Sequence, residues 1–170
     1  MANRHLLRST TMQILYQIDV TDRWFHENLW DVISESISRF SFDLTDTSYI
    51  KEVISGIIKN KSEIDETISK YSNGWNIETI SLVERNILRI ALFEILFYND
   101  QDIPFKVAIN EAIELSKMFS GKPASKFING VLGGLVNDLD SKGYNLIDTE
   151  DKKIKINEAV VEENEQDIVN

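Results

Sequence analysis

Basic side chains without neighbouring carboxylates lie near the start of the chain, and their types suggest a specific chemistry. Arg4, His5 and Arg8 fall within residues 1–18, which contain no acid, and the first carboxylate is Asp19. An arginine guanidinium carries five N–H donors in a planar fork that matches the oxygens of a phosphate. The stretch therefore indicates a local surface for an anion.

A second acid-free stretch covers residues 115–137 and carries Lys117, Lys122 and Lys126. The chain as a whole is acidic, with 28 Asp and Glu against 18 Lys and Arg and a formal net charge of −10. An acidic protein with two basic stretches can still present one face to nucleic acid. A chance distribution of the acids is the simpler alternative, and charge alone does not separate the two.

Catalytic and metal-binding patterns are missing from the sequence. The chain has no cysteine, which excludes a thiolate nucleophile and cysteine-ligated zinc, and its two histidines, His5 and His26, are too few for a histidine-rich metal site. Glu111 and Glu114 stand three residues apart, a spacing more typical of the solvated face of a helix than of catalytic carboxylates. We expect a protein that is not an enzyme and that uses no cofactor or metal.

Helices must position these basic residues, because apolar residues recur every three or four positions along most of the 170-residue chain. Two prolines and seven glycines are too few for a turn-dense β-sandwich. The pattern predicts an all-α fold of about seven helices in two helical subdomains, near residues 1–73 and 74–147. The expected helices begin after Asn3, near Leu29, at Thr45 or Thr47 with a break near Asn60, before Ile80, at Pro104 and at Pro123.

Several polar and small residues lie inside these predicted helices. Gly130, Gly133 and Gly134 each cost the last helix about 1 kcal/mol relative to alanine. We interpret them as sites of close helix–helix packing, and Asn110 and Asn129 as polar links between helices. The run from 90 to 98 is apolar except for Glu94, so the helix that contains it is expected to be central and buried.

Residues 148–170 differ from the rest of the chain. They contain eight acids against three bases and no aromatic residue, so we expect a disordered tail. No charge-free apolar run approaches the ~20 residues that span a bilayer, and the N-terminus lacks the pattern of a signal peptide. We expect a cytoplasmic protein without membrane contact.

Three segments of the chain carry specific motifs. The first is RHLLR at 4–8 followed by QILY at 13–16, and the second is VERNILRIALFE at 83–94. The third is IPFKVAINEAIELSK at 103–117, which continues to KFINGVL at 126–132. Together they resemble the NusB family of bacterial transcription antitermination factors. The resemblance covers about residues 4–139 and implies the seven-helix NusB-like fold. A methyltransferase that carries the same fold as one domain would need a far longer chain.

The resemblance also implies a function. NusB-family factors bind single-stranded boxA-type RNA together with the ribosomal protein NusE, and the pair nucleates an antitermination complex on RNA polymerase, notably in rRNA transcription. Their RNA face combines the basic N-terminal segment with the start of the last helix. The corresponding residues here, with two basic or polar neighbours included, are Arg4, His5, Arg8, Lys122, Ser125, Lys126, Phe127 and Asn129.

Three residues are candidates for contacts with the protein partner. Tyr16 and Glu84 match positions of protein-partner or RNA contacts in the family. Glu94 is added because a basic ribosomal protein needs an acidic surface. Tyr16 and Glu84 have a simpler alternative, in which their side chains form hydrogen bonds between helices. Phe127, proposed to stack on a base, is in phase with Val131 and can equally belong to the core.

The alternative function is a helical protein-interaction module without RNA binding. Such a protein would bind another protein, or it would be a homodimer that buries its basic stretches at the interface. A salt titration of RNA binding separates the two, since counterion release weakens true RNA binding as salt rises.

Overall fold

The computed structural model describes residues 3–40, 46–98 and 103–142, and the predicted tail at 148–170 lies outside them. Seven α-helices confirm the all-α prediction: α1 (Arg4–Val20), α2 (Leu29–Phe40), α3 (Ser48–Lys59), α4 (Lys61–Lys70), α5 (Leu82–Leu96), α6 (Phe105–Phe119) and α7 (Lys122–Ser141). A single 3₁₀ turn, η1 (Ile77–Thr79), precedes α5.

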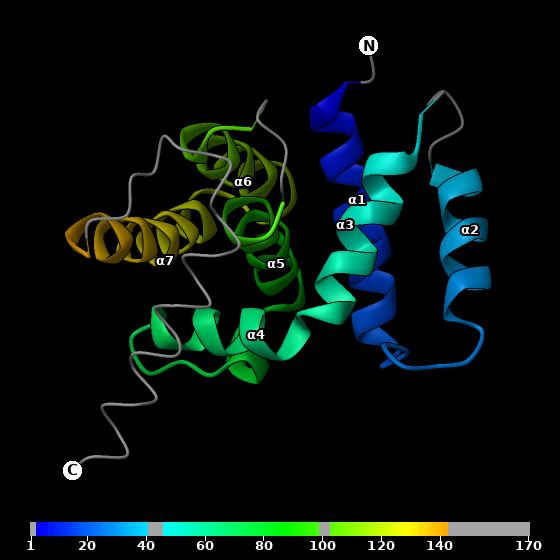
Figure 1. The fold of residues 1–170 in the computed structure, drawn as a ribbon, viewed down its shortest axis with the longest axis horizontal. Coiled ribbons are helices and arrows are strands. Elements are labelled where there is room, and N and C mark those ends of the chain that lie inside the picture. Colours follow the sequence, from blue (N-terminus) through cyan, green and yellow to red (C-terminus); the bar gives the residue numbers. More distant parts are fainter. Residues whose placement is uncertain (1–2, 41–45, 99–102, 143–170) are drawn as a thin grey trace.

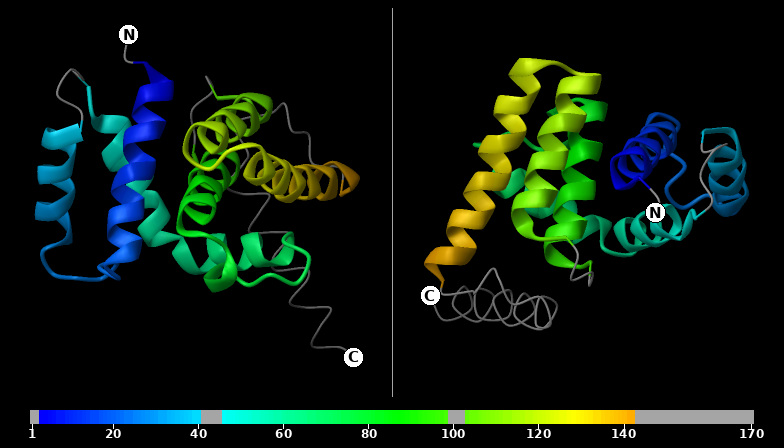
Figure 2. Two further views of the ribbon diagram at one scale, coloured as in Figure 1. Left: turned by 180° about the vertical axis from the view of Figure 1, so that it is seen from behind. Right: turned by 90° about the horizontal axis from the view of Figure 1, so that it is seen from above.

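Helix α5 occupies the centre of the fold. It packs against α1, α3, α4, α6 and α7, and its residues from Asn86 to Leu96 are all buried. Helices α6 and α7 lie together on one side of it, and α1, α2 and α3 lie on the other, with α2 outermost (Figures 1 and 2). The central, buried position predicted for this helix is therefore confirmed. The division into two subdomains near residue 73 remains an interpretation, because α4 packs on both α3 and α5.

Side-chain caps and turns set the helix boundaries close to where the sequence predicts them. The Asn3 side chain accepts from the backbone N–H groups of His5 and Leu6 and begins α1. The break at Asn60 separates α3 from α4. Helix α3 begins at one of the two predicted positions, with Thr47 as its N-cap residue, but the Thr47 side chain forms no capping hydrogen bond and the Asp46 carboxylate accepts from the Ser48 N–H instead.

A buried network of charged side chains joins the end of α1 to α4 and α5. The Asp19 carboxylate accepts from Arg85 at 2.7 and 2.8 Å and from Arg89 at 2.8 Å. Arg89 also donates to Asp65 at 2.8 and 3.1 Å, and the Lys61 ammonium lies 2.9 Å from the same carboxylate. Burial alone would raise the pKa of Asp19, but the two arginines and the Asn86 amide together lower it.

The glycines of α7 do not all lie at helix contacts. A Cβ built on Gly134 would come within 3.3 Å of the Tyr71 ring, whereas a Cβ on Gly130 or Gly133 meets no atom within 4 Å. The close-packing interpretation therefore holds for Gly134 alone of the three. The tightest glycine is Gly56 of α3, where a Cβ would lie 2.1 Å from the ring of Phe93.

Candidate nucleic-acid interface

The first two turns of α7 carry basic residues that are available to an anion. Lys122, Lys126 and Asn129 are exposed at spacings of four and three residues, which places them on one side of the helix. None of these three side chains forms a hydrogen bond or ion pair with any residue that the structure describes. The first turn of α7 contains no acid, and the partial positive charge of a helix N-terminus adds to the lysine charges.

Ser125 and Phe127 hold this end of α7 against the rest of the fold. The Ser125 hydroxyl lies 2.7 Å from the Ser116 hydroxyl of α6, and Phe127 is half-buried against the core. Ile128, not Phe127, is the fully buried residue in this turn. The Ser125 hydroxyl is therefore engaged with α6, and only part of the Phe127 ring is exposed.

Arg8 is not part of an exposed surface, contrary to the prediction. Its guanidinium donates to the two carboxylate oxygens of Glu94 at 2.7 and 2.8 Å, and the Tyr49 hydroxyl donates to the same carboxylate at 2.9 Å. Arg8 is only 3% exposed and Glu94 only 1% exposed. Burial alone would lower the pKa of Arg8, but the hydrogen bond and the charge of Glu94 outweigh it and raise that pKa.

The same ion pair corrects the partner assignment of Glu94. A carboxylate that is buried and shared between Arg8 and Tyr49 cannot contact a protein at the surface. The prediction failed because it counted acids along the sequence, whereas the acid that neutralises Arg8 comes from another helix, 86 residues away.

Arg4 and His5 lie at the start of α1 and are half-buried. The Arg4 guanidinium lies 5.6 Å from the centre of the Tyr49 ring, and His5 Nδ1 lies 2.8 Å from Glu111 Oε2. The spacing of Glu111 and Glu114 suggested that both acids are solvated, but Glu111 instead contacts His5. The N-terminal basic stretch offers less free positive charge than its sequence indicates.

Helix α6 lies between the two basic segments. Its Glu111 contacts His5 of α1, and its Ser116 contacts Ser125 of α7. Five residues of helix separate these two contacts, or about 7.5 Å along the axis at 1.5 Å per residue. The structure thus brings the start of α1 and the start of α7 to neighbouring parts of α6.

The exposed side of α6 adds residues that the sequence interpretation did not assign to this surface. Lys106 and Asn110 are exposed one turn apart, and neither side chain has a partner among the described residues. Asn110 and Asn129 are both exposed, so neither is a polar link between helices. The helical period could have identified Lys106, because it stands on the side of α6 opposite Ala108 and Ala112.

Tyr16 and Glu84 remain available to a partner. Helices α1 and α5 run antiparallel, since Arg8 pairs with Glu94 and Asp19 with Arg85. Tyr16 is exposed and Glu84 half-buried. Within the described ranges neither the Tyr16 hydroxyl nor the Glu84 carboxylate forms a hydrogen bond, so the alternative of an internal bond between helices is wrong. Their role in partner binding stays a prediction.

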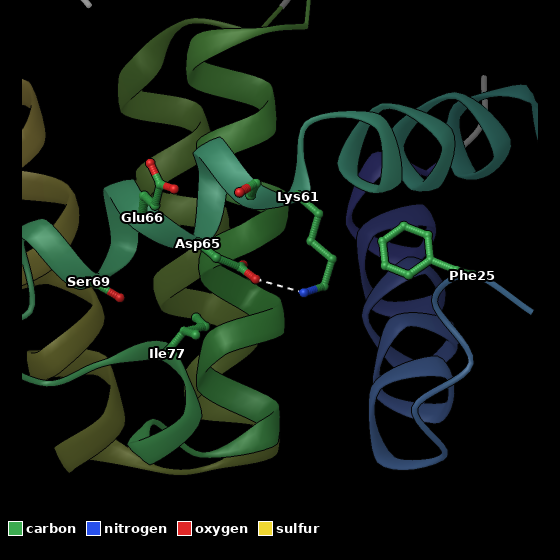
Figure 3. Close-up of a pocket in the computed structure, with 7 residues that line it drawn as sticks. Phe25, Lys61, Asp65, Glu66, Ser69 and Ile77 are labelled. Atoms are coloured by element: carbon green, nitrogen blue, oxygen red, sulfur yellow. Dashed lines mark hydrogen bonds and ion pairs between the residues drawn. The ribbon is translucent and has the colours of Figure 1, made fainter. Parts of the chain in front are cut away.

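A separate open groove of about 500 Å³ lies between the loop after α1 and helix α4 (Figure 3). Its lining residues are Phe25, Lys61, Ser62, Asp65, Glu66, Ser69 and Ile77. The described ranges hold no group of three or more His, Asp or Glu side chains that could bind a metal ion. No helix among them has the length and apolar character to cross a membrane.

Comparisons with known proteins agree on one family. The model of the NusB family matches residues 5–137. The transcription antitermination protein NusB of Acetivibrio thermocellus is 39% identical over 133 residues, covering 78% of this chain and 88% of the relative. That of Clostridium botulinum is 42% identical over 144 residues, covering 79% and 99%.

Solved structures match as well. The structure of T. maritima NusB has a TM-score of 0.70 and 32% identity, covering 81% of this chain and 92% of that one. A second structure contains the antitermination factors NusB and NusE in complex with dsRNA, with a TM-score of 0.67, 26% identity, and coverage of 79% and 96%.

Proposed function

This chain belongs to the NusB family of non-enzymatic transcription antitermination proteins, and from that membership we propose that it binds single-stranded boxA-type RNA together with NusE. The pair would nucleate an antitermination complex on RNA polymerase in the cytoplasm, notably during rRNA transcription. A relative with the same fold forms a complex with NusE and dsRNA, which supports NusE and an RNA as partners.

The exposed start of α7 is the observation that carries the RNA proposal. Lys122 and Lys126 are cations without a counter-charge among the described residues, and they stand at the positive end of a helix. Phosphates that replace solvent there gain charge-assisted hydrogen bonds without displacing an existing ion pair. Asn129, one turn further on, has an amide that can donate to and accept from a base edge.

The two segments have unequal roles in this proposal. Lys122, Lys126 and Asn129 contact RNA directly, and part of the Phe127 ring offers a surface on which an unpaired base can stack. Arg4 and His5 lie at the edge of this RNA surface, which they reach beside α6. Ser125 positions α7, and Arg8 affects RNA binding only by stabilising the fold. Tyr16 and Glu84 form the partner surface on the α1–α5 pair.

RNA-binding measurements with and without NusE test this function. The probe is a fluorescently labelled single-stranded boxA RNA, and the readout is anisotropy at fixed ionic strength. The expected result is binding that strengthens when NusE is added, because the two proteins then contribute contacts to one complex. A scrambled RNA of equal length and a double-stranded boxA competitor serve as controls for sequence and for strandedness.

The alternative predicts a different outcome. If the protein is a homodimer whose interface buries the basic segments, then sedimentation will show a dimer and the RNA signal will be absent with or without NusE. That result would overturn the RNA proposal.

A further inference from the structure

The start of α1 contains an imidazole that a carboxylate from another helix holds in place. His5 Nδ1 lies 2.8 Å from Glu111 Oε2 of α6. An ionised carboxylate only accepts hydrogen bonds, so Nδ1 carries the proton and Nε2 is the ring nitrogen left for a ligand. The His5 side chain is 38% exposed, and Nε2 forms no hydrogen bond with any residue that the structure describes. Glu111 thus orients a partly exposed ring that keeps one nitrogen for a ligand.

The same carboxylate connects His5 to the buried ion pair between α1 and α5. Glu111 Oε2 also lies 3.8 Å from Arg8 Nη1, whereas Arg8 Nε and Nη2 donate to Glu94. One arginine therefore faces two glutamates. The charge of this linked cluster depends on His5: the cluster carries one net negative charge when the imidazole is neutral, and no net charge when the imidazole is protonated.

The other ionisable groups around this cluster keep their charge near neutral pH. Arg4, on the first turn of α1, stays protonated, and its guanidinium lies 5.6 Å from the centre of the Tyr49 ring. Burial and the carboxylate to which it donates raise the pKa of Tyr49 well above its usual value, so this phenol stays neutral. On α6, Glu114 pairs with Lys117. Histidine is the side-chain type that changes charge between about pH 5 and 8, so among these described groups the response to pH falls to His5.

A protonated His5 favours a phosphate in two ways. The imidazolium can donate a charge-assisted hydrogen bond from Nε2, which a neutral ring with its proton on Nδ1 cannot do. Protonation also cancels the net negative charge of the cluster, which otherwise repels a phosphate. Glu111 takes part in both effects, because it fixes which nitrogen remains for the ligand and stabilises the cationic ring.

We propose that Glu111 is a positioning residue for RNA binding, which holds His5 so that protonation of the imidazole turns the start of α1 into a phosphate contact. RNA binding then takes up a proton from solvent at His5, and the affinity rises as the pH falls from about 8 to about 5.5. The inference rests on the proposed function, since it assumes that RNA lies across the starts of α1 and α7. It gives the N-terminal segment a role that the buried Arg8 cannot have.

The test is the affinity for labelled single-stranded boxA RNA at about pH 5.5 and about pH 8, measured alone and with saturating NusE. The parent protein should bind about fivefold more tightly at the lower pH, which is the upper range for a partly exposed ionic contact. Its slope of log affinity against log salt should also be steeper at the lower pH by up to about 0.7, for one further phosphate contact on a single strand.

Substitutions of the two histidines assign the pH response to one side chain. His5→Gln should show the weaker affinity of the parent at both pH values, whereas His5→Lys, which keeps a cation, should show the tighter affinity at both. His26→Gln is the matched control. It replaces the other histidine of the chain, which is exposed in the loop after α1, and it should keep the full pH response of the parent.

Glu111→Gln tests the positioning role. It should flatten the pH response, because the imidazolium loses its carboxylate partner. At about pH 8 it should bind RNA at least as tightly as the parent, because one negative charge is gone. A residue that serves only the fold would instead lower the affinity at both pH values, and that result would overturn the positioning role.

The remaining outcomes separate this inference from the proposed function. If the parent binds boxA RNA and His5→Gln keeps the full pH response, the inference is wrong while the proposed function stands. If the parent binds boxA RNA at neither pH, alone or with NusE, the proposed function fails and the inference falls with it.

Discussion

Replacing Arg8 with alanine separates a role in folding from a role in RNA binding. The substitution removes the guanidinium that donates to both oxygens of Glu94, and it leaves a carboxylate that is 1% exposed with the Tyr49 hydroxyl as its remaining donor. Removing one partner of a buried ion pair costs about 3–5 kcal/mol, because the other charge stays out of water without compensation. A typical domain has a free energy of unfolding of about 5–15 kcal/mol, so the loss is a large fraction of the total stability.

The assays are urea unfolding, which gives the free energy of unfolding, and thermal melting, which gives the Tm; both are monitored by far-ultraviolet circular dichroism. At this chain length a loss of 1 kcal/mol lowers the Tm by about 2–4 °C, so the Arg8→Ala variant should melt about 6–20 °C below the parent. The matched control is Lys126→Ala, which removes an exposed cation and should change the free energy of unfolding by less than about 0.5 kcal/mol. RNA affinity is measured at a temperature where both variants are folded. Lys126→Ala should lower this affinity more than Arg8→Ala does, the reverse of their effects on stability.

A second substitution completes this test. Arg8→Met combined with Glu94→Leu removes both charges and should recover much of the lost stability, since apolar residues of similar volume often replace a buried pair at little cost. The reasoning is refuted if Arg8→Ala leaves the free energy of unfolding unchanged and lowers RNA affinity as much as Lys126→Ala does. That result would place Arg8 at the RNA surface.

Three further outcomes follow from the same structure. Asp19 has a lowered pKa in the folded state, so its contribution to stability is present above its unfolded pKa and is lost as the pH falls through the folded value. Asp19→Asn should therefore cost about 3–5 kcal/mol at pH 7, and denaturant titrations should show this cost decreasing progressively as the pH falls below the unfolded pKa. Gly56→Ala should destabilise the fold by about 1–3 kcal/mol because its Cβ would meet the Phe93 ring. Gly133→Ala, in open space on a helix, should stabilise it by about 1 kcal/mol, and thermal melts of both variants measure the two changes. Deleting the acidic residues 148–170 should strengthen RNA binding modestly at low salt, with a gain that disappears at high salt, and equal affinities at low salt would contradict this.

The sequence predicts the helices well because their signals are local. Apolar spacing identifies the stripes, and Asn3, Asn60 and the turn at Asn73–Gly74 mark boundaries through caps and backbone conformations that involve only nearby residues. The resemblance identifies the family and the segments that contain the candidate site. Both kinds of inference depend on short stretches of the chain.

The partners of charged side chains could not be predicted in this way. Arg8 meets Glu94, and His5 meets Glu111, only after α1 packs against α5 and α6. A charge count along the chain treats these groups as free, because the compensating acids are far away in sequence. The interpretation of the α7 glycines fails for a related reason: a glycine in a helical sequence does not itself show whether another helix will pack against it.

The salt dependence of RNA affinity tests the central claim most directly. The parent protein and the double variant Lys122→Ala with Lys126→Ala are titrated with single-stranded boxA RNA at a series of salt concentrations, after circular dichroism has confirmed that both are folded. Each phosphate contact on a single strand contributes about 0.7 to the slope of log affinity against log salt. The account predicts weaker binding by the double variant and a slope shallower by about 1.4, and equal slopes and affinities for the two proteins would contradict it.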